Sequence, residues 1–229
     1  MNGSQFLKAY ENEFNVKVRT PAQDNAEQII NSILYNLFRK NPDGMAKTRT
    51  FTEIQRRLSE QRVLEPTHIT DDQLLKQIGA FAEQVTQHLV AHLEDYQTYE
   101  AYSPPVELLA ECNVDIGWLE RAVGQVCQRP VAFSGDYSLL RYEGEGKGRY
   151  PHVDRDVYHI NLLFLISREH REGHTPHDFY YYDDAGERHE ERLTPGHAIL
   201  FDGANTVHGR WLSDYSARTL ALSFGFRPI

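Results

Sequence analysis

Two histidines and one aspartate in the second half of the chain have the residue types and the spacing of metal ligands. His152 and Asp154 lie two residues apart, just before the apolar segment 159–166 (HINLLFLI). Side chains two apart on a strand point to the same side, so this spacing directs an imidazole and a carboxylate at one point. A third ligand, His208, follows the apolar segment 197–203 (HAILFDG). Two histidines and one carboxylate hold Fe(II) on one face and leave three coordination positions open.

An arginine and a tyrosine flank these ligands in the sequence. Arg218 comes ten residues after His208 and opens a further apolar strand. The residues predicted to share its face of that strand are Leu220, Leu222 and Phe224. A guanidinium among apolar side chains needs an anionic partner, and a carboxylate is the natural one because it accepts two hydrogen bonds. Tyr142 comes ten residues before His152.

The order of these residues resembles that of the 2-oxoglutarate- and Fe(II)-dependent dioxygenases, and more narrowly that of their prolyl-hydroxylase-like branch. The resemblance covers about residues 130–229 and includes the glycine-rich turn 143–148 (EGEGKG) and the Pro-Gly pair at 195–196. It implies that the three ligands bind Fe(II), that Arg218 binds the distal carboxylate of 2-oxoglutarate, and that Tyr142 hydrogen-bonds to this co-substrate.

Some details of the co-substrate contacts stay open. The resemblance implies Asn161 as a further contact, with a structural hydrogen bond as the alternative, because an unpaired buried amide is costly. Arg210 competes with Arg218 as the carboxylate anchor. The sequence also departs from the family in two places. Leu220 stands two residues after the arginine, where Ser or Thr is frequent, and 176–179 (PHDF) replaces a frequent Gly-Gly pair.

The reaction that the resemblance implies is the oxidative decarboxylation of 2-oxoglutarate to succinate and CO2, coupled to hydroxylation of a C–H bond. O2 is the second co-substrate, and no catalytic residue beyond the metal ligands is implied. The carboxylate of Asp154 favours hydroxylation over halogenation, because related halogenases have a small residue at that position. Desaturation and ring closure stay open.

The sequence says less about the substrate. Four arginines near the ligands are candidates for binding an anionic substrate group, or for forming an exposed basic rim: Arg141, Arg149, Arg155 and Arg210. We expect a small molecule, such as an amino acid or a natural-product intermediate. Hydroxylation of a protein side chain is the first alternative, and a non-catalytic, cupin-like metal- or ligand-binding barrel is the second. The other histidines, including His88 and His92, are expected to pack or to face solvent.

The chain changes character near Pro130. After it, short strand-like segments alternate with turns, which is typical of a sandwich or barrel, and the family's fold is a double-stranded β-helix, or jelly roll. Before it, apolar periodicity predicts helices over 27–38 and about 115–127. Capping boxes at 50–53 (TFTE) and 70–73 (TDDQ) are expected to open two more. The fold class is therefore mainly β with α.

The length and composition fit one soluble domain. We expect residues 1–229 to form a single oxygenase domain in which a mostly helical region, residues 1–129, packs on a jelly-roll core, residues 130–229. The net charge of -9 argues against a nucleic-acid partner. No apolar run approaches the length of a membrane span, and segment 1–14 lacks a secretory leader. Two cysteines without a CxxC motif indicate reduced core thiols and a cytoplasmic location.

Overall fold

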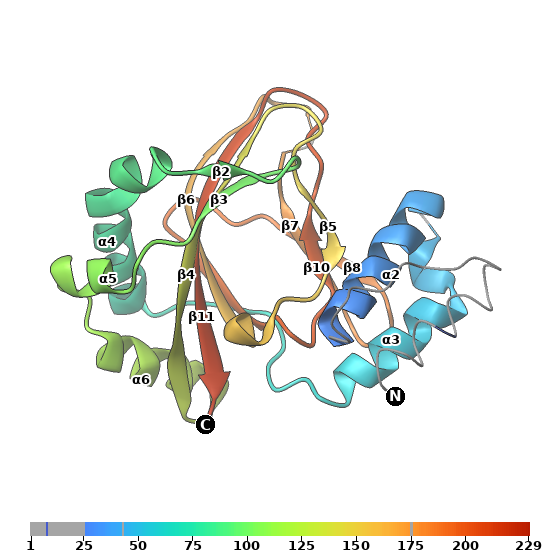
Figure 1. Ribbon diagram of the computed structural model, residues 1–229, viewed down its shortest axis with the longest axis horizontal. Coiled ribbons are helices and arrows are strands. Elements are labelled where there is room, and N and C mark those ends of the chain that lie inside the picture. The colour runs from blue at the N-terminus through green and yellow to red at the C-terminus, as the bar shows by residue number, and fades with distance from the viewer. Residues whose placement is uncertain (1–7, 9–25, 43, 175) are drawn as a thin grey trace.

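Helices cover the outer faces of two antiparallel sheets that lie opposite each other (Figure 1). The computed structural model describes residue 8 and residues 26–42, 44–174 and 176–229. The prediction that segment 1–14 lacks a secretory leader falls outside these residues. Among the helices that are described, none is both long and apolar enough to cross a membrane.

The helices come mainly from the first half of the chain and the strands from the second. The helices are α2 (Ala26–Lys40), η1 (Met45–Lys47), α3 (Arg49–Ser59), α4 (Asp72–Val90), α5 (Glu107–Glu111), α6 (Ile116–Cys127) and η2 (Asp156–Tyr158). The strands are β1 (Thr67–His68), β2 (Glu94–Asp95), β3 (Glu100–Tyr102), β4 (Val131–Glu143), β5 (Arg149–His152), β6 (Ile160–Glu169), β7 (Phe179–Tyr182), β8 (Arg188–Glu191), β9 (Ala198–Asp202), β10 (His208–Arg210) and β11 (Arg218–Pro228). The predicted mainly β class with flanking helices is confirmed at this level.

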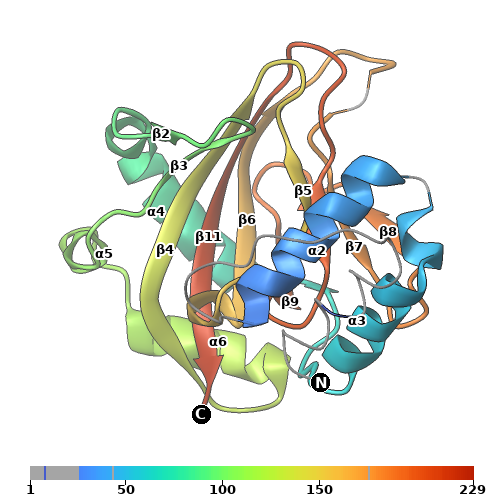
Figure 2. The same ribbon diagram turned by 45° about the vertical axis from the view of Figure 1, so that its right-hand side comes forward.

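The strands form two sheets with all their pairings antiparallel. The larger sheet has the order β1-β9-β6-β11-β4-β3-β2, and the smaller has the order β5-β10-β7-β8. From β4 onward the chain crosses from one sheet to the other at every connection except the β7–β8 hairpin. Helices α4 to α6 cover the larger sheet, and α2 lies against β5 of the smaller one (Figure 2). The early strands β1, β2 and β3 extend the larger sheet, which the sequence reading did not foresee.

Alternation along β11 decides which side chains face the helices and which face the interior. Leu222 and Phe224 belong to the buried cluster between the larger sheet and α4 to α6. Ala221 belongs to the cluster between the two sheets. Phe224 stacks on Tyr137 with ring centres 5.8 Å apart and an interplanar angle of 10°, and Phe81 of α4 lies 6.1 Å from it. Even-numbered side chains in this part of β11 therefore point outward and odd-numbered ones point inward.

Two predicted helix starts need correction. The N-cap of α3 is Thr48, whose hydroxyl accepts a hydrogen bond from the Phe51 amide at 3.2 Å. Thr50 lies in the first turn with only 2% of its surface exposed, so it does not cap the helix. The N-cap of α4 is Asp71, since its carboxylate accepts from two backbone amides of the first turn. The helix predicted near 115–127 is confirmed as α6.

The stacked rings on the outer face of the larger sheet lead to a stability prediction. Phe224 is 1% exposed, so Phe224→Ala is expected to lower the free energy of unfolding by about 3–5 kcal/mol, because it removes buried contacts and leaves a cavity. Urea denaturation measures this. Ile229→Ala, at a side chain that is 82% exposed, is the control, with an expected change below about 0.5 kcal/mol. Equal effects of the two substitutions would contradict the described packing.

Candidate metal centre

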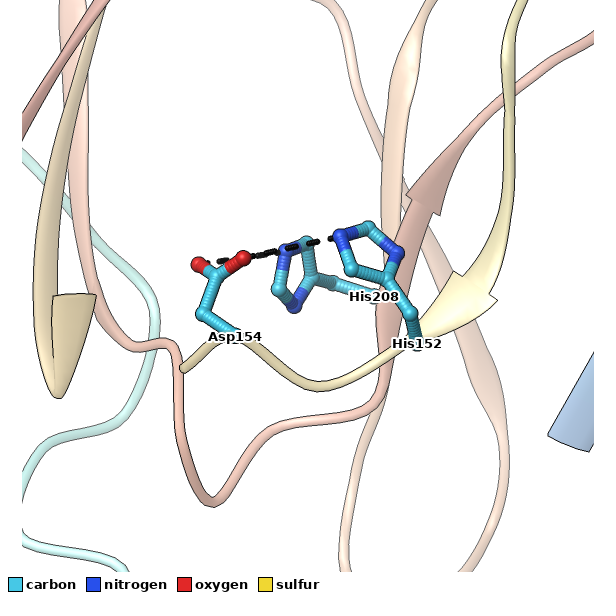
Figure 3. A group of neighbouring side chains, drawn as sticks. All are labelled: His152, Asp154 and His208. Carbon is cyan, nitrogen blue, oxygen red and sulfur yellow. Dashed lines mark ion pairs between the residues drawn. The ribbon is translucent and has the colours of Figure 1, made fainter. Parts of the chain in front are cut away.

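Antiparallel pairing of two short strands brings the three predicted metal ligands together. His152 ends β5 and His208 begins β10, and the two residues are direct partners in the sheet. Asp154 lies two residues beyond β5, and each of its carboxylate oxygens is 3.5 Å from the Nε2 of one imidazole. The side chains point toward one another (Figure 3). Within the described portion of the chain, this is the one group of three such side chains close enough to share a metal ion.

Backbone carbonyls fix both imidazoles in the orientation that a metal needs. The Nδ1 of His152 lies 2.9 Å from the carbonyl oxygen of Tyr150, and the Nδ1 of His208 lies 2.9 Å from that of Thr206. A carbonyl only accepts, so each Nδ1 carries the proton and each Nε2 presents its lone pair. The Nε2 of His152 is buried without a hydrogen-bond partner. A buried, unpaired lone pair beside a carboxylate fits a divalent transition metal.

The electrostatics of the centre keep these ligands in their metal-binding forms. Burial opposes ionisation of Asp154, but the two imidazoles and Arg149 outweigh it and hold its pKa below the usual value. Burial lowers the pKa of His208 to about 3. Burial and Arg149 also lower the pKa of His152. At neutral pH the centre therefore consists of two neutral imidazoles and one carboxylate, without a proton to displace.

Asn161 supports the carboxylate ligand. Its Nδ2 donates to Oδ2 of Asp154 at 2.8 Å, and its Oδ1 accepts from the Ser223 hydroxyl at 2.8 Å. The structure thus gives Asn161 the structural hydrogen bonds that were the alternative to a co-substrate contact. A partner of this kind orients a ligand and tunes its basicity.

Asn31 of α2 holds the backbone between the first two ligands, a role that the sequence did not indicate. Its Nδ2 donates to the carbonyl oxygen of Val153 at 2.9 Å, and its Oδ1 accepts from the Val153 amide at 2.8 Å. Val153 is the residue between the first two ligands, so one amide side chain pairs with the backbone of the ligand segment as a neighbouring strand would. The two residues are 122 positions apart, and no local spacing links them.

The centre lies on the wall of a cavity of about 740 Å³. Apolar walls come from the facing sheets, and they include Leu163, Phe179 and Phe201. Helix α2 contributes Tyr35 and Asn31 to the same cavity. This volume is in the usual range for a small-molecule site.

Arg218, the predicted carboxylate anchor, does not line this pocket. Its side chain is 39% exposed, and its Nε lies 3.8 Å from the carboxylate of Glu143. Alternation along β11 puts Arg218 on the outer face with Leu222. The inner face carries Thr219, which is fully buried, and Ser223, which lines the pocket. The anionic partner that the sequence predicted for Arg218 is therefore Glu143, the last residue of β4.

Two other arginines enter the pocket instead. Arg210 lies two residues after His208 on β10, so both side chains face the interior. Arg210 is 5% exposed; its Nη1 donates to the carbonyl oxygen of His177 at 3.0 Å, and its Nη2 is buried without a partner. Arg149 begins β5 and lines the same pocket, with its guanidinium 4.9 Å from the centre of the Tyr99 ring.

The remaining arginine candidates are less suited to bind a ligand here. Arg141 forms ion pairs with Glu100 and Glu143 and does not line the pocket. Arg155 lines the pocket but is exposed at its rim. Of the four predicted candidates, Arg149 and Arg210 therefore lie inside the pocket, Arg155 lies at its rim, and Arg141 lies outside it.

Tyr142 lies inside the pocket, as the sequence reading required. It is 1% exposed, and the guanidinium of Arg210 lies 5.1 Å from the centre of its ring. Burial raises the pKa of the Tyr142 hydroxyl, although Arg210 and Arg149 oppose this. The hydroxyl is thus protonated at neutral pH and available as a hydrogen-bond donor.

Comparisons with known proteins bear on the fold. Neither a protein-family model nor a curated protein matches the sequence. A solved prolyl-4-hydroxylase from Pseudomonas putida is 14% identical, with a TM-score of 0.53 over 78% of this chain and 98% of that one. A 2OG-Fe(II) oxygenase family oxidoreductase from Burkholderia pseudomallei is 11% identical, with a TM-score of 0.53 over 76% and 88% of the two chains. The chain has the fold of the 2OG-Fe(II) oxygenases.

A third solved structure with this fold is that of an enzyme named for epimerisation and not for hydroxylation. It is the α-ketoglutarate-dependent epimerase SnoN from nogalamycin biosynthesis, 12% identical, with a TM-score of 0.52 over 77% of this chain and 83% of that one. At the level of fold, the resemblance predicted from the sequence is confirmed, and a prolyl-4-hydroxylase is among the solved structures that share this fold. The fold is thus compatible with more than one outcome at the substrate.

The contact between Asn161 and Asp154 leads to a prediction about metal affinity. Asn161→Ala removes the donor that orients the carboxylate, and we expect the dissociation constant for Fe(II) or Co(II) to rise about 10- to 100-fold. Anaerobic titration followed by metal absorption measures it. Gly79→Ala is the control, because its new methyl group meets one ring carbon of Phe164 at an ordinary 3.6 Å. Unchanged affinity in Asn161→Ala would show that the hydrogen bond does not matter for binding.

Proposed function

We propose that the protein is an Fe(II)- and 2-oxoglutarate-dependent oxygenase that hydroxylates a small molecule. The observation that carries this proposal is the pair of oriented imidazoles and the carboxylate on the wall of a 740 Å³ pocket, with a buried Nε2 that has no partner. The oxygenase fold supports it. Hydroxylation of a protein side chain is the first alternative. A non-catalytic, cupin-like barrel is the second, and the band experiment below separates it from an oxygenase.

The proposal includes the architecture of the barrel. We propose a double-stranded β-helix, which is supported by the regular crossing of the chain between the two sheets from β4 to β11. We also propose that residues 1–229 form one domain, in which the mostly helical region (residues 1–129) packs on the core (residues 130–229). Contacts such as the Asn31–Val153 pair, which joins the two regions, support this arrangement. A cytoplasmic location stays a prediction.

His152, Asp154 and His208 would hold the iron in this proposal. When bound, iron with 2-oxoglutarate and O2 supplies the oxidising power for the reaction, and 2-oxoglutarate leaves as succinate and CO2. The protein holds the ligands at fixed positions through the carbonyls of Tyr150 and Thr206 and through Asn161. The apolar walls of the pocket exclude water from the reacting groups.

Arg210 and Tyr142 are the proposed anchor for the distal carboxylate of 2-oxoglutarate, in place of Arg218. Arg210 is two strand positions from His208, about 7 Å along β10, so a short dicarboxylic acid bound at the metal can extend to it. Its Nη2 lacks a partner, and a buried guanidinium without an anion is costly. The protonated hydroxyl of Tyr142 is a second donor beside it. Together they account for a carboxylate-binding site at the inner end of the pocket.

A visible charge-transfer band of chelated 2-oxoglutarate tests the proposed function. Under nitrogen, protein loaded with Fe(II) and 2-oxoglutarate is expected to show this weak band, and His152→Ala is expected to abolish it because one metal ligand is lost. Exposed His68→Ala is the control and should keep the band. In air, succinate release above the metal-free background is expected. Folded, iron-loaded protein without a band would favour the cupin-like alternative.

The position of the anchor gives a separate prediction. Arg210→Gln is expected to raise the dissociation constant for 2-oxoglutarate at least about tenfold, because it removes a charge-assisted hydrogen bond in a buried site. Arg218→Gln is the matched control and is expected to change it by less than about twofold, because Arg218 is half-exposed and paired with Glu143. Titration of the band with 2-oxoglutarate measures both values. The opposite ranking of the two variants would restore the sequence-based assignment.

A further inference from the structure

A row of three tyrosines leads from the mouth of the pocket to its interior. Tyr96, at the mouth, is 50% exposed and stacks on Tyr99, with ring centres 5.3 Å apart and an interplanar angle of 13°. Tyr99 lies 5.9 Å from Tyr142, which is almost completely buried. All three rings line the same cavity. The row therefore marks an outer and an inner region of one pocket.

The guanidinium of an arginine lies over the ring of each of the two inner tyrosines. The guanidinium of Arg149 lies 4.9 Å from the ring centre of Tyr99, and that of Arg210 lies 5.1 Å from the ring centre of Tyr142. Contact with an aromatic face holds a guanidinium in one plane and leaves the N–H groups at its edge free to donate. The pocket thus presents two positioned guanidinium groups, on residues that are direct partners across β5 and β10.

Neither guanidinium has an ion-pair partner among the described residues. Two arginines outside the pocket do have one, since Arg141 pairs with Glu100 and Arg218 pairs with Glu143. Arg155, at the rim, is exposed to solvent. The chain as a whole has a net charge of -9, so its general field does not attract anions. Two unpaired cations in one pocket of an acidic protein are best explained by two anionic groups that bind there.

We propose that Arg149 binds a carboxylate of the substrate, while Arg210 binds the co-substrate. This inference rests on the proposed function. Arg149 is near the metal centre, because it begins β5, the short strand that ends at His152, and it lines the same pocket as the three ligands. A carboxylate held by Arg149 therefore places the rest of the substrate beside the metal ligands.

The side chains that line the outer part of the pocket indicate the chemistry of the rest of the substrate. Tyr35 of α2 and Tyr99 of the tyrosine row line this region, and Tyr35 packs edge-on against Tyr150 with ring centres 5.0 Å apart. Aromatic walls beside the guanidinium of Arg149 suit an aromatic or apolar body that carries one carboxylate. The substrate class is thus a small carboxylic acid with an aromatic or apolar body, which includes N-acylated amino acids.

Matched ligand pairs test this assignment. Four carboxylates are titrated by calorimetry into protein loaded with Fe(II) and 2-oxoglutarate under nitrogen, each beside its uncharged amide: phenylacetate, 3-phenylpropionate, indole-3-acetate and N-acetyl-L-phenylalanine. We expect at least one acid to bind about 10- to 100-fold more tightly than its amide. Arg149→Gln is expected to abolish that preference and to keep the charge-transfer band. Arg129→Gln, at an exposed arginine that does not line the pocket, is the control and should keep both.

The outcomes separate this inference from the proposed function. A band in the wild type and in Arg149→Gln, without a carboxylate preference in any pair, overturns the substrate site and leaves the oxygenase proposal intact. Loss of the band in Arg149→Gln overturns it too, because Arg149 then holds the co-substrate. Absence of the band in folded, iron-loaded wild type contradicts the oxygenase proposal itself. In that case, an acid preference that depends on Arg149 still supports a carboxylate site.

Discussion

The antiparallel pairing of β5 with β10 is the constraint on which the rest of the site depends. It makes His152 and His208 direct partners, and the Nδ1 atom of each lies against the backbone carbonyl two residues before it. Burial keeps both imidazoles neutral, and Asp154 stays ionised beside them. A metal centre needs this preorganisation because ligands on separate flexible loops would lose entropy when they bind. The two sheets and their helical covers hold this one strand pair in position.

The helical half of the chain contributes more than a cover. Helix α2 packs on the smaller sheet through an apolar cluster, and Asn31 extends from the same helix to pair with the backbone of Val153. The segment between the first two ligands is beyond the end of β5, where no neighbouring strand satisfies its backbone groups. Asn31 supplies both missing hydrogen bonds. The position of α2 and the geometry of the metal centre are thus coupled.

Desolvation accounts for the distribution of arginines around the pocket. Arg141 and Arg218 lie outside the pocket, where glutamates neutralise their partly exposed side chains. Arg210 and Arg149 are held against tyrosine rings inside the pocket without a carboxylate. Isolated buried cations destabilise a fold, so a protein retains them where binding requires them. For the same reason, the charged groups inside the pocket indicate the chemistry of the ligand better than the net negative charge of the chain does.

The sequence by itself determined the chemistry of the centre. The types and order of His152, Asp154 and His208, together with the period-two alternation of the second half, were enough to predict a metal centre in a mainly β fold. Sequence spacing did not show which arginine enters the pocket, nor that Asn31 reaches the ligand segment. Both depend on long-range packing: alternation and sheet pairing turn Arg218 outward and Arg210 inward. Guanidinium groups are alike in a sequence, and only their burial and partners distinguish them.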